Sequence, residues 1–352
     1  MAAFVFPGLA TRVLFGVGTV LDLQAEVERL GMRHALVITG KQQSDLGKSI
    51  SAQLGALTFN QAAMHTPLQV TDAAMAMVQR HAIDGLIAIG GGSAIGLGKA
   101  IAFRTDLAQI AVPTTYAGSE MTPILGETSG GVKTTIRDPR IQPETVIYDP
   151  DLTRTLPQRL VAASGINAMA HAVEALYAKD GNPLTALMAE EGIRLLGSSL
   201  PAVETARSEA LLGAWLCGAA LGATGMALHH KLCHVLGGSF ALPHAETHTV
   251  VLPHVTAFNA DAAPDAMRSI ACALSVDVAA QGIFDLARRL GAPSSLKELG
   301  LREEDLDRAA SLTIATSSWN PRPLTWDGVR TLLDDAFHGR RPRAYTHNSQ
   351  SE

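Results

Sequence analysis

The sequence lacks most of the features that would place the protein outside the ordinary globular class. It has only 3 cysteines, at Cys217, Cys233 and Cys272, which favours buried thiols in a reducing compartment over a disulfide framework. No uninterrupted apolar run approaches about 18 residues, and the first residues lack the charged segment, apolar core and cleavage site of a secretory leader. We therefore expect a cytoplasmic protein without a membrane partner.

The sequence also has no excess of basic residues. Its formal net charge is -5, and its one basic cluster, Arg340, Arg341 and Arg343, lies in a polar tail. Binding to nucleic acid requires a basic surface, so we expect no nucleic-acid partner. The last dozen residues, ending HNSQSE, are too polar to pack and are expected to be disordered.

At 352 residues with 47% hydrophobic residues, the chain is long enough for two domains. In the first 150 residues, short apolar strands alternate with amphipathic helices, which predicts an α/β domain with a doubly wound parallel sheet. The ligand crevice of such a sheet lies at the carboxyl ends of its strands. The expected strands are His34–Thr39, Gly85–Ile89, Ala108–Val112 and Thr145–Tyr148.

From about Leu156 the pattern changes to long segments rich in alanine and leucine. We expect a boundary near residue 155, marked by Asp149-Pro150 and Pro157, with an α/β domain over 1–155 and an all-α domain over 156–352. The expected helices are Arg159–Tyr177, Leu184–Leu196, Glu209–Leu236 and Asp277–Leu290.

Two loops that follow expected strands carry residues suited to phosphate binding. Gly90, Gly91, Gly92 and Ser93 precede a helix that contains Lys99, and glycines there let a backbone approach a pyrophosphate at a helix N-terminus. The spacing is neither G-x-G-x-x-G nor a Walker motif, so the glycines alone could simply form a tight turn. The next loop, PTTYAGSE at 113–120, adds hydroxyl groups at Thr114, Thr115 and Ser119.

The helical half contains a pattern of histidines typical of metal-binding helices. Asn167-x3-His171 is followed by His230-x3-His234-x9-His244. Residues i and i+4 share a helix face, so each pair can direct two side chains at one point. A divalent-metal site would be expected to carry a carboxylate at the first position, where this chain has an amide.

These segments together resemble the iron-containing alcohol dehydrogenase superfamily, whose fold is shared with dehydroquinate synthase and glycerol dehydrogenase. The resemblance covers nearly the whole chain and implies an N-terminal dinucleotide-binding domain, an all-helical C-terminal domain, and an active site between them. It rests on Phe15-Gly16-x-Gly18, GGGS at 90–93, PTTYAGSE at 113–120, Asp149-Pro150, GINAMAHAVEA at 165–175, and HHKLCHVLGGSFALPH at 229–244.

Two departures from the superfamily pattern indicate a branch. Alcohol dehydrogenases of this type usually read GGGSxxDxxK and Asp-x3-His, where this chain has Gly96 and Asn167. Together with the segment 318–323, these changes resemble the maleylacetate reductases, which reduce maleylacetate to 3-oxoadipate in the breakdown of aromatic compounds. A neutral amide binds a hard divalent cation less well than a carboxylate does, so we expect no tightly held metal, although the carbonyl oxygen of Asn167 leaves weak binding open.

The resemblance implies roles for individual residues. We expect the histidines to line the substrate pocket, with either His234 or His244 as the proton donor, and cationic side chains to bind a dicarboxylate substrate. The expected catalytic set is His171, His230, His234, His244, Asn167, Lys133 and Arg322, with Arg137 as a further candidate cation. The expected cofactor-binding set is Gly40, Lys41, Gly90, Gly91, Gly92, Ser93, Lys99, Thr114, Thr115 and Ser119.

The residues after the first long strand bear on the choice of cofactor. Gly40-Lys41-Gln42-Gln43 offers no carboxylate to repel a 2′-phosphate, so both NADH and NADPH are expected to serve. Two alternatives stay open: a metal-dependent alcohol or polyol dehydrogenase, and an inactive homologue that only binds nucleotide. The resemblance further suggests a homodimer.

Overall fold

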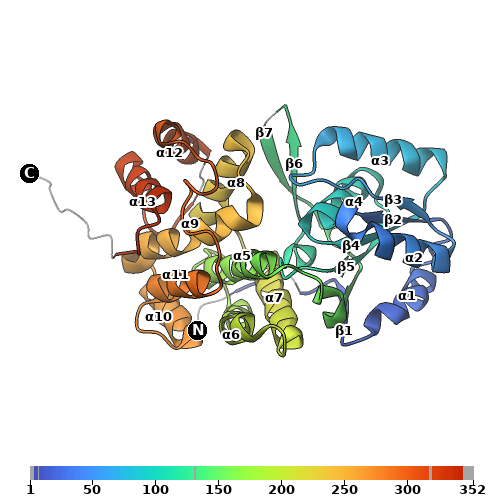
Figure 1. Ribbon diagram of the computed structural model, residues 1–352, viewed down its shortest axis with the longest axis horizontal. Coiled ribbons are helices and arrows are strands. Elements are labelled where there is room, and N and C mark those ends of the chain that lie inside the picture. Colours follow the sequence, from blue (N-terminus) through green and yellow to red (C-terminus); the bar gives the residue numbers. More distant parts are fainter. Residues whose placement is uncertain (1–3, 7, 131, 317–318, 344–352) are drawn as a thin grey trace, which may run out of the picture.

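A computed structural model of the chain describes residues 4–6, 8–130, 132–316 and 319–343. These residues form one half built on a parallel sheet and one half built from helices, which lie beside each other (Figure 1). The last strand of the sheet ends at Tyr148, and the first long helix of the other half begins at Gln158.

The sheet has six parallel strands in the order β1-β8-β5-β4-β2-β3. The four strands expected from the sequence are confirmed as β2, β4, β5 and β8, whereas the short edge strands β1 and β3 were not expected. The strands are β1 (Arg12–Phe15), β2 (Ala35–Thr39), β3 (Leu57–Phe59), β4 (Gly85–Gly90), β5 (Ala108–Pro113) and β8 (Thr145–Tyr148).

Helices cover both faces of this sheet. Helices α1 (Leu23–Arg29) and α2 (Ser44–Leu54) pack on one face, against residues such as Val37, and α3 (Leu68–Arg80) and α4 (Gly92–Thr105) pack on the other, against residues such as Leu36. Alternate residues of each central strand are thus buried on opposite sides, which explains why these strands read as continuous apolar runs. The doubly wound fold expected from the sequence is confirmed.

A two-stranded antiparallel hairpin, β6 (Ile124–Ser129) and β7 (Val132–Arg137), extends from the sheet half and lies next to α8 of the helical half (Figure 1). These two strands were not expected from the sequence, because they carry polar and charged residues and lack the apolar pattern of the buried sheet. The hairpin brings Thr135 to the boundary between the halves.

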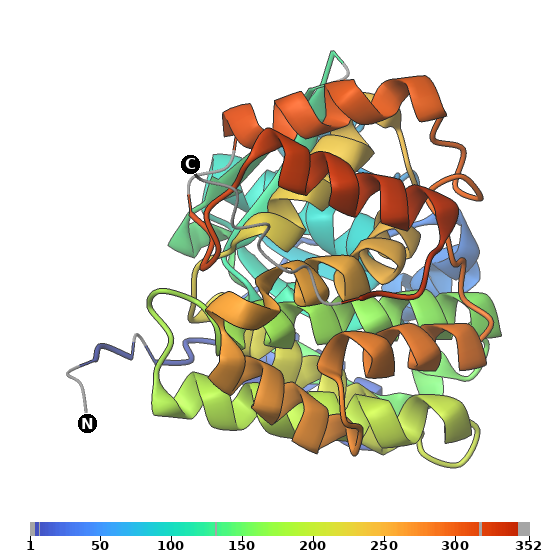
Figure 2. The same cartoon turned by 90° about the vertical axis from the view of Figure 1, so that its left-hand side faces the viewer.

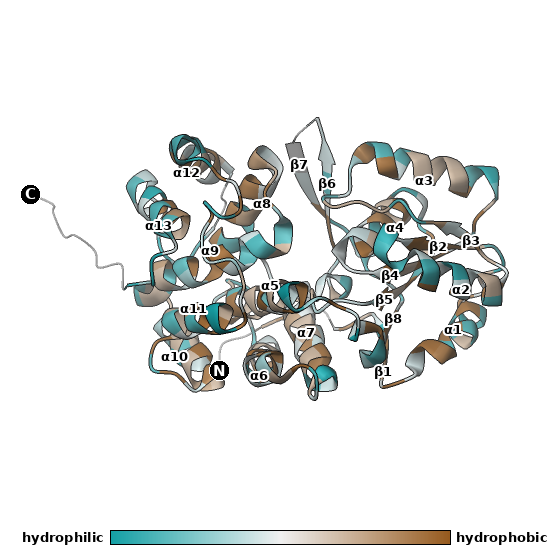
Figure 3. Ribbon diagram, viewed as in Figure 1, coloured by the Kyte–Doolittle hydropathy of each residue, from teal (hydrophilic) through white to brown (hydrophobic). Residues whose placement is uncertain are grey.

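The helical half consists of two packed groups of helices (Figure 2). Helices α5, α6, α7, α10 and α11 share one hydrophobic core, and α8, α9, α12 and α13 share a second. Several of these helices carry hydrophilic and hydrophobic residues on different sides, as amphipathic helices around a core do (Figure 3). The helices are α5 (Gln158–Leu176), α6 (Pro183–Ser199), α7 (Arg207–Gly222), α8 (Leu228–Phe240), α9 (His244–Asn259), α10 (Pro264–Leu274), α11 (Ala279–Arg289), α12 (Leu306–Thr316) and α13 (Trp326–His338).

The expectation of one continuous helix over Glu209–Leu236 was wrong. Helix α7 ends at Gly222 and α8 begins at Leu228, because a buried carboxylate provides a better partner for the backbone between them. Glu174 of α5 accepts hydrogen bonds from the N–H groups of Ala227 and His229, at 2.9 and 2.7 Å. A carboxylate at the first turn satisfies N–H groups that have no partner within the helix and interacts favourably with the helix dipole.

Two further expectations are refined. Cys217 and Cys233 are buried, but Cys272 is exposed on α10, so the prediction of buried thiols was wrong for that residue.

The segment Pro264–Arg289 is apolar and long enough to resemble a membrane span, yet it forms the separate helices α10 and α11 of 11 residues each. A helix that spans a bilayer needs about 20 residues, so neither is long enough.

The two halves meet tightly where the loop after β5 crosses α7. Gly118 has a φ of 77°, and a side chain at Gly218 of α7 would fall onto the carbonyl oxygen of Gly118. The closeness of the two backbones therefore depends on the absence of a Cβ at both positions.

Substitution Gly218→Ala should lower the free energy of unfolding by about 1–3 kcal/mol, since inserting a methyl group into a packed contact forces the backbones apart. Chemical denaturation followed by circular dichroism measures this change. The matched control is Glu209→Gln on the exposed side of the same helix, which should change stability by less than about 0.5 kcal/mol. Equal stability of Gly218→Ala and the control would contradict this description of the contact.

Candidate active site

A cleft of about 1110 Å³ lies between the two halves and is lined by residues from both. On the sheet side, the lining comes from the loops that follow β2, β3, β4 and β5, at the carboxyl ends of the strands, where ligands of doubly wound sheets bind. On the helical side, it comes from α5, from α8 and from the beginning of α9.

The glycine loop after β4 leaves room for a phosphate group. Helix α4 begins at Gly92, so its first N–H groups have no intrahelical partner and face the cleft loop. A Cβ at Gly91 would lie 2.8 Å from Cγ2 of Thr115, and Gly90 has a φ of 147°, which side chains rarely allow. The loop therefore depends on glycine at both positions, and Gly91, Gly92 and Ser93 line the cleft.

Most residues of the expected cofactor set line the cleft, and two do not. Gly90 and Thr114 lie just behind it, where the N–H of Thr114 donates to the carbonyl of Gly90 at 3.0 Å and joins the ends of β4 and β5. The members that line the cleft are Gly40, Lys41, Gly91, Gly92, Ser93, Lys99, Thr115 and Ser119.

Lys99 reaches the cleft wall but is bound to the protein itself. Its side chain is 2% exposed, and its Nζ donates to the carbonyl oxygens of Ser119, Thr122 and Ile124 at 2.5, 2.7 and 3.1 Å. Burial lowers the pKa of this amine to about 7, while the nearby carboxyl of Glu120 acts in the opposite direction. Three carbonyl oxygens around one amine favour its protonated form, so Lys99 holds the loop after β5 in place.

The helical side of the cleft carries the histidine pattern. Asn167 and His171 lie one turn apart on α5, His230 and His234 lie one turn apart on α8, and His244 is the first residue of α9. The rings of His171 and His230 stack with centroids 5.2 Å apart. The structure thus brings together, along one wall, the imidazoles that are about sixty residues apart in the sequence.

Glu174 fixes the orientation of one of these imidazoles. Its Oε2 lies 2.7 Å from Nδ1 of His230, and its side chain is fully buried. The carboxylate accepts the Nδ1 proton, so Nε2 is the ring atom left for a ligand; this buried Nε2 has no hydrogen-bond partner within the described residues. Glu174 lies three residues after His171 in GINAMAHAVEA, but no role was expected for it from the sequence.

The remaining imidazoles have different surroundings. Burial lowers the pKa of His171 well below the usual value, and the neighbouring His230 and Lys99 lower it further, so His171 is neutral at pH 7. Nδ1 of His234 lies 3.3 Å from Oγ1 of Thr135 on β7, which ties α8 to the hairpin. His244 lies at the helix start, with its ring 4.4 Å from that of His248.

The residues at the metal-ligand positions of the superfamily pattern include no carboxylate, although Glu246 lines the same cleft. Asn167, His171, His230 and His244 include no anionic ligand, and a hard cation prefers carboxylates. Oδ1 of Asn167 is buried without a hydrogen-bond partner in the described part of the chain, so it is available to a ligand of any kind. Among the described residues, the ring nitrogens of the cleft imidazoles do not lie close enough together to form a cluster of metal ligands.

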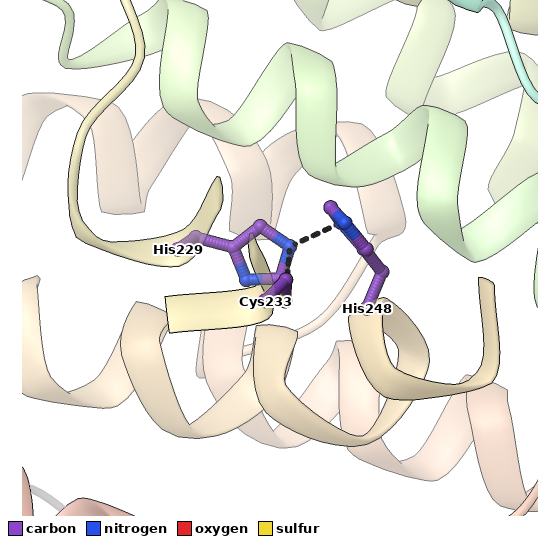
Figure 4. Close-up of side chains that lie close together, drawn as sticks. All are labelled: His229, Cys233 and His248. Atoms are coloured by element: carbon purple, nitrogen blue, oxygen red, sulfur yellow. Dashed lines mark hydrogen bonds between the residues drawn. The ribbon is translucent and has the colours of Figure 1, made fainter. Parts of the chain in front are cut away.

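The described residues contain such a cluster only behind the cleft, in His229, Cys233 and His248 (Figure 4). Nε2 of His229 lies 2.9 Å from Nδ1 of His248 and 3.8 Å from Sγ of Cys233, and none of the three lines the cleft. Burial lowers the pKa values of His229 and His248 well below the usual range, so both rings are neutral and share one hydrogen bond. His248 packs against His230 and His244 and supports the wall from behind.

Two of the cationic residues expected to bind substrate, Arg322 and Arg137, do not line the cleft. Arg322 donates to the carbonyl oxygen of Phe258 at 3.0 Å and lies over its ring, away from the cleft. Arg137 donates to the carbonyl oxygens of Gly222 and Thr224. Lys133 lies on β7, but its side chain is outside the part of the chain that the structure describes.

Other lining residues were missed. Arg159 on the first turn of α5 and His65 in the loop after β3 both line the cleft. Neither lies in a motif, and β3 itself was not recognised, so the sequence contained no signal that would have placed the loop holding His65 at the cleft.

Comparison with known proteins supports the family expected from the motifs. Residues 10–150 match the model of the iron-containing alcohol dehydrogenases, and residues 161–337 match that of the C-terminal region of the same family. The chain is 50% identical over 351 residues to maleylacetate reductase of Rhizobium sp. (strain MTP-10005), covering 97% of this chain and 100% of that protein.

Solved structures agree with these matches. The crystal structure of maleylacetate reductase from Agrobacterium tumefaciens superposes with a TM-score of 0.91 at 51% identity, covering 97% of this chain and 100% of that one. Sulfoacetaldehyde reductase from Bifidobacterium kashiwanohense, solved with NAD+, shares the fold at 24% identity with a TM-score of 0.85. The chain therefore belongs to the iron-containing alcohol dehydrogenase family, and within it to the group of the maleylacetate reductases.

Proposed function

We propose that the protein reduces the carbon–carbon double bond of maleylacetate to give 3-oxoadipate, with NADH or NADPH as reductant and without a bound metal ion. The observation that carries this proposal is that Asn167 and imidazoles, with no carboxylate among them, occupy the positions of metal ligands. The nicotinamide cofactor supplies the hydride when bound.

The chemistry explains why such a cleft suffices. Reduction of a carbonyl group places a full negative charge on one oxygen, which a Lewis acid stabilises well. When a double bond conjugated to a ketone is reduced at the carbon β to that ketone, the charge spreads over an enolate. Hydrogen-bond donors placed at the ketone oxygen can stabilise this weaker charge.

The surroundings of each imidazole divide the roles. His230, whose Nδ1 is held by Glu174, donates from Nε2 to the ketone oxygen, because the carboxylate stabilises the positive charge that the ring needs to do so. His171 stays neutral through burial and acts as a hydrogen-bonding wall. The proton that the α carbon requires comes from either His234 or His244, as expected from the sequence.

The sheet side supplies cofactor binding. The N–H groups at the start of α4 and the hydroxyl groups of Thr115 and Ser119 bind the pyrophosphate and ribose, and Lys41 lies in the loop that faces the adenosine end. No carboxylate lines the cleft between Gly40 and Gln43, so a 2′-phosphate is tolerated. We also propose a cytoplasmic homodimer, as in the expectation from the resemblance.

The proposed activity is tested by the loss of nicotinamide absorbance with freshly generated maleylacetate, followed by mass spectrometry of the product. We expect 3-oxoadipate with both cofactors, at catalytic efficiencies within about a thousandfold, since a larger ratio would need roughly 4 kcal/mol of discrimination. Turnover of simple alcohols or polyols with no reaction of maleylacetate would contradict the proposal and favour a polyol dehydrogenase.

Substitution Glu174→Gln should reduce kcat/KM for maleylacetate by about 10- to 100-fold, because a neutral amide no longer stabilises a charged His230 ring. Steady-state kinetics with saturating NADH measures the change. Glu191→Gln, at a surface carboxylate that pairs only with Arg194 in the described residues, is the matched control and should keep full activity. A Glu174→Gln enzyme with efficiency within twofold of the parent would show that His230 acts without this carboxylate.

A further inference from the structure

The loop between β3 and α3 has an unusual backbone at the edge of the cleft. His65 and Thr66 have φ values of 63° and 45°, and neither is a glycine. Two consecutive side-chain-bearing residues in the left-handed region are strained, and such strain persists only where the surrounding structure enforces it and where it often serves a site.

Contacts with Thr128 of the hairpin hold this conformation. The N–H of Thr128 on β6 donates to the carbonyl of Thr66 at 3.2 Å, and Pro67 pairs with Thr128 as an isolated bridge. Thr66 is buried, with 5% of its surface exposed. The loop is thus fastened to the hairpin immediately before α3 begins, and its position is fixed.

Two glycines leave the space that the loop occupies. A Cβ at Gly96 would lie 2.6 Å from Oγ1 of Thr66, and a Cβ at Gly237 would lie 3.3 Å from Cε1 of His65. Gly96 stands where the superfamily pattern GGGSxxDxxK carries an aspartate. A side chain at position 96 would therefore meet the Thr66 hydroxyl, and that hydroxyl would have to move.

His65 therefore lies on the sheet side of the cleft, next to His244 of the helical half. His65 lines the cleft, and its ring lies edge-on to that of His244, with centroids 6.3 Å apart. The ring N–H groups of histidine donate well to a carboxylate. Since Arg322 and Arg137 bind backbone carbonyls elsewhere, His65 is placed to take over part of their expected role.

We propose that His65 forms a subsite for one carboxylate of the substrate, and that Gly96 is free of a side chain so that the strained loop can hold His65 there. The inference rests on the proposed function, because it requires a dicarboxylate substrate. His65 contributes to binding and not to hydride or proton transfer.

The subsite is tested by the kinetics of His65→Ala and of Gly96→Ala. Both should raise KM for maleylacetate by about 10- to 100-fold, the range of a lost hydrogen bond to a charged group, with kcat changed less than about threefold. The affinity for NADH, measured by fluorescence titration, should be unchanged. His65→Gln, which keeps an N–H donor, should recover part of the loss, and the exposed His81→Ala serves as the control.

A double substitution tests the link between the glycine and the loop. Thr66→Ala removes the Oγ1 atom that the new methyl group would meet, so Gly96→Ala combined with Thr66→Ala should restore KM to within about threefold of the Thr66→Ala enzyme. If KM stays high in the double variant, or if Gly96→Ala weakens NADH binding instead, the link is wrong.

Inhibition separates failure of the subsite from failure of the proposed function. Adipate should bind more tightly than hexanoate in the parent enzyme, and His65→Ala should abolish most of that preference, whether or not maleylacetate is turned over. If maleylacetate is reduced but His65→Ala leaves both KM and the adipate preference within twofold, the subsite is refuted. A fall in kcat at unchanged KM would also refute it, because it would place His65 in the chemistry.

Discussion

Glu174 is a fully buried carboxylate in the middle of the helical half, and the geometry of the cleft depends on its three hydrogen bonds. Two come from the N–H groups of Ala227 and His229 and set the point at which α8 begins. The third involves Nδ1 of His230 and sets the rotation of that ring. One side chain therefore determines where α8 starts, which way its histidines face, and which nitrogen of His230 meets a ligand. A buried charge is costly unless it is fully paired, so the arrangement is sensitive to any change at this position.

The cleft combines this fixed charge behind the wall with Asn167 and imidazoles on its surface, beside the lining side chains of Lys41, Arg159 and Glu246. Burial keeps His171 on this surface uncharged, and Asn167 adds no charge of its own; His229 and His248, which lie behind the wall, are uncharged as well. His248 packs behind His230 and His244, so the wall is formed by imidazoles supported by imidazoles. Such a surface can hydrogen-bond to an enolate oxygen without attracting a divalent ion strongly. The loss of a carboxylate at position 96 fits the same picture on the opposite side, where the space is filled by the loop of Thr66.

The sequence predicted the parts of this structure that depend on local patterns. The central strands were recognisable because both faces of the sheet are covered, and the helix pairs Asn167/His171 and His230/His234 were recognisable because i, i+4 spacing places side chains on one face. The break between α7 and α8 was not, because it results from Glu174, which is more than fifty residues away. His65 escaped notice because its position depends on contacts between distant segments, and the hairpin because its strands lack an apolar pattern. Arg322 was assigned to the cleft without knowledge of its contact with Phe258.

The central claim is that hydrogen-bond donors, and not a metal ion, stabilise the enolate. The most direct measurement is the activity of enzyme whose zinc, iron and manganese contents have been brought below about 0.05 equivalents by chelation, as determined by mass spectrometry of the metals. The account predicts that kcat for maleylacetate stays within about twofold of that of untreated enzyme and does not increase when these ions are added back. Activity that falls in proportion to the metal removed, and that returns with one equivalent of a single ion, would contradict it.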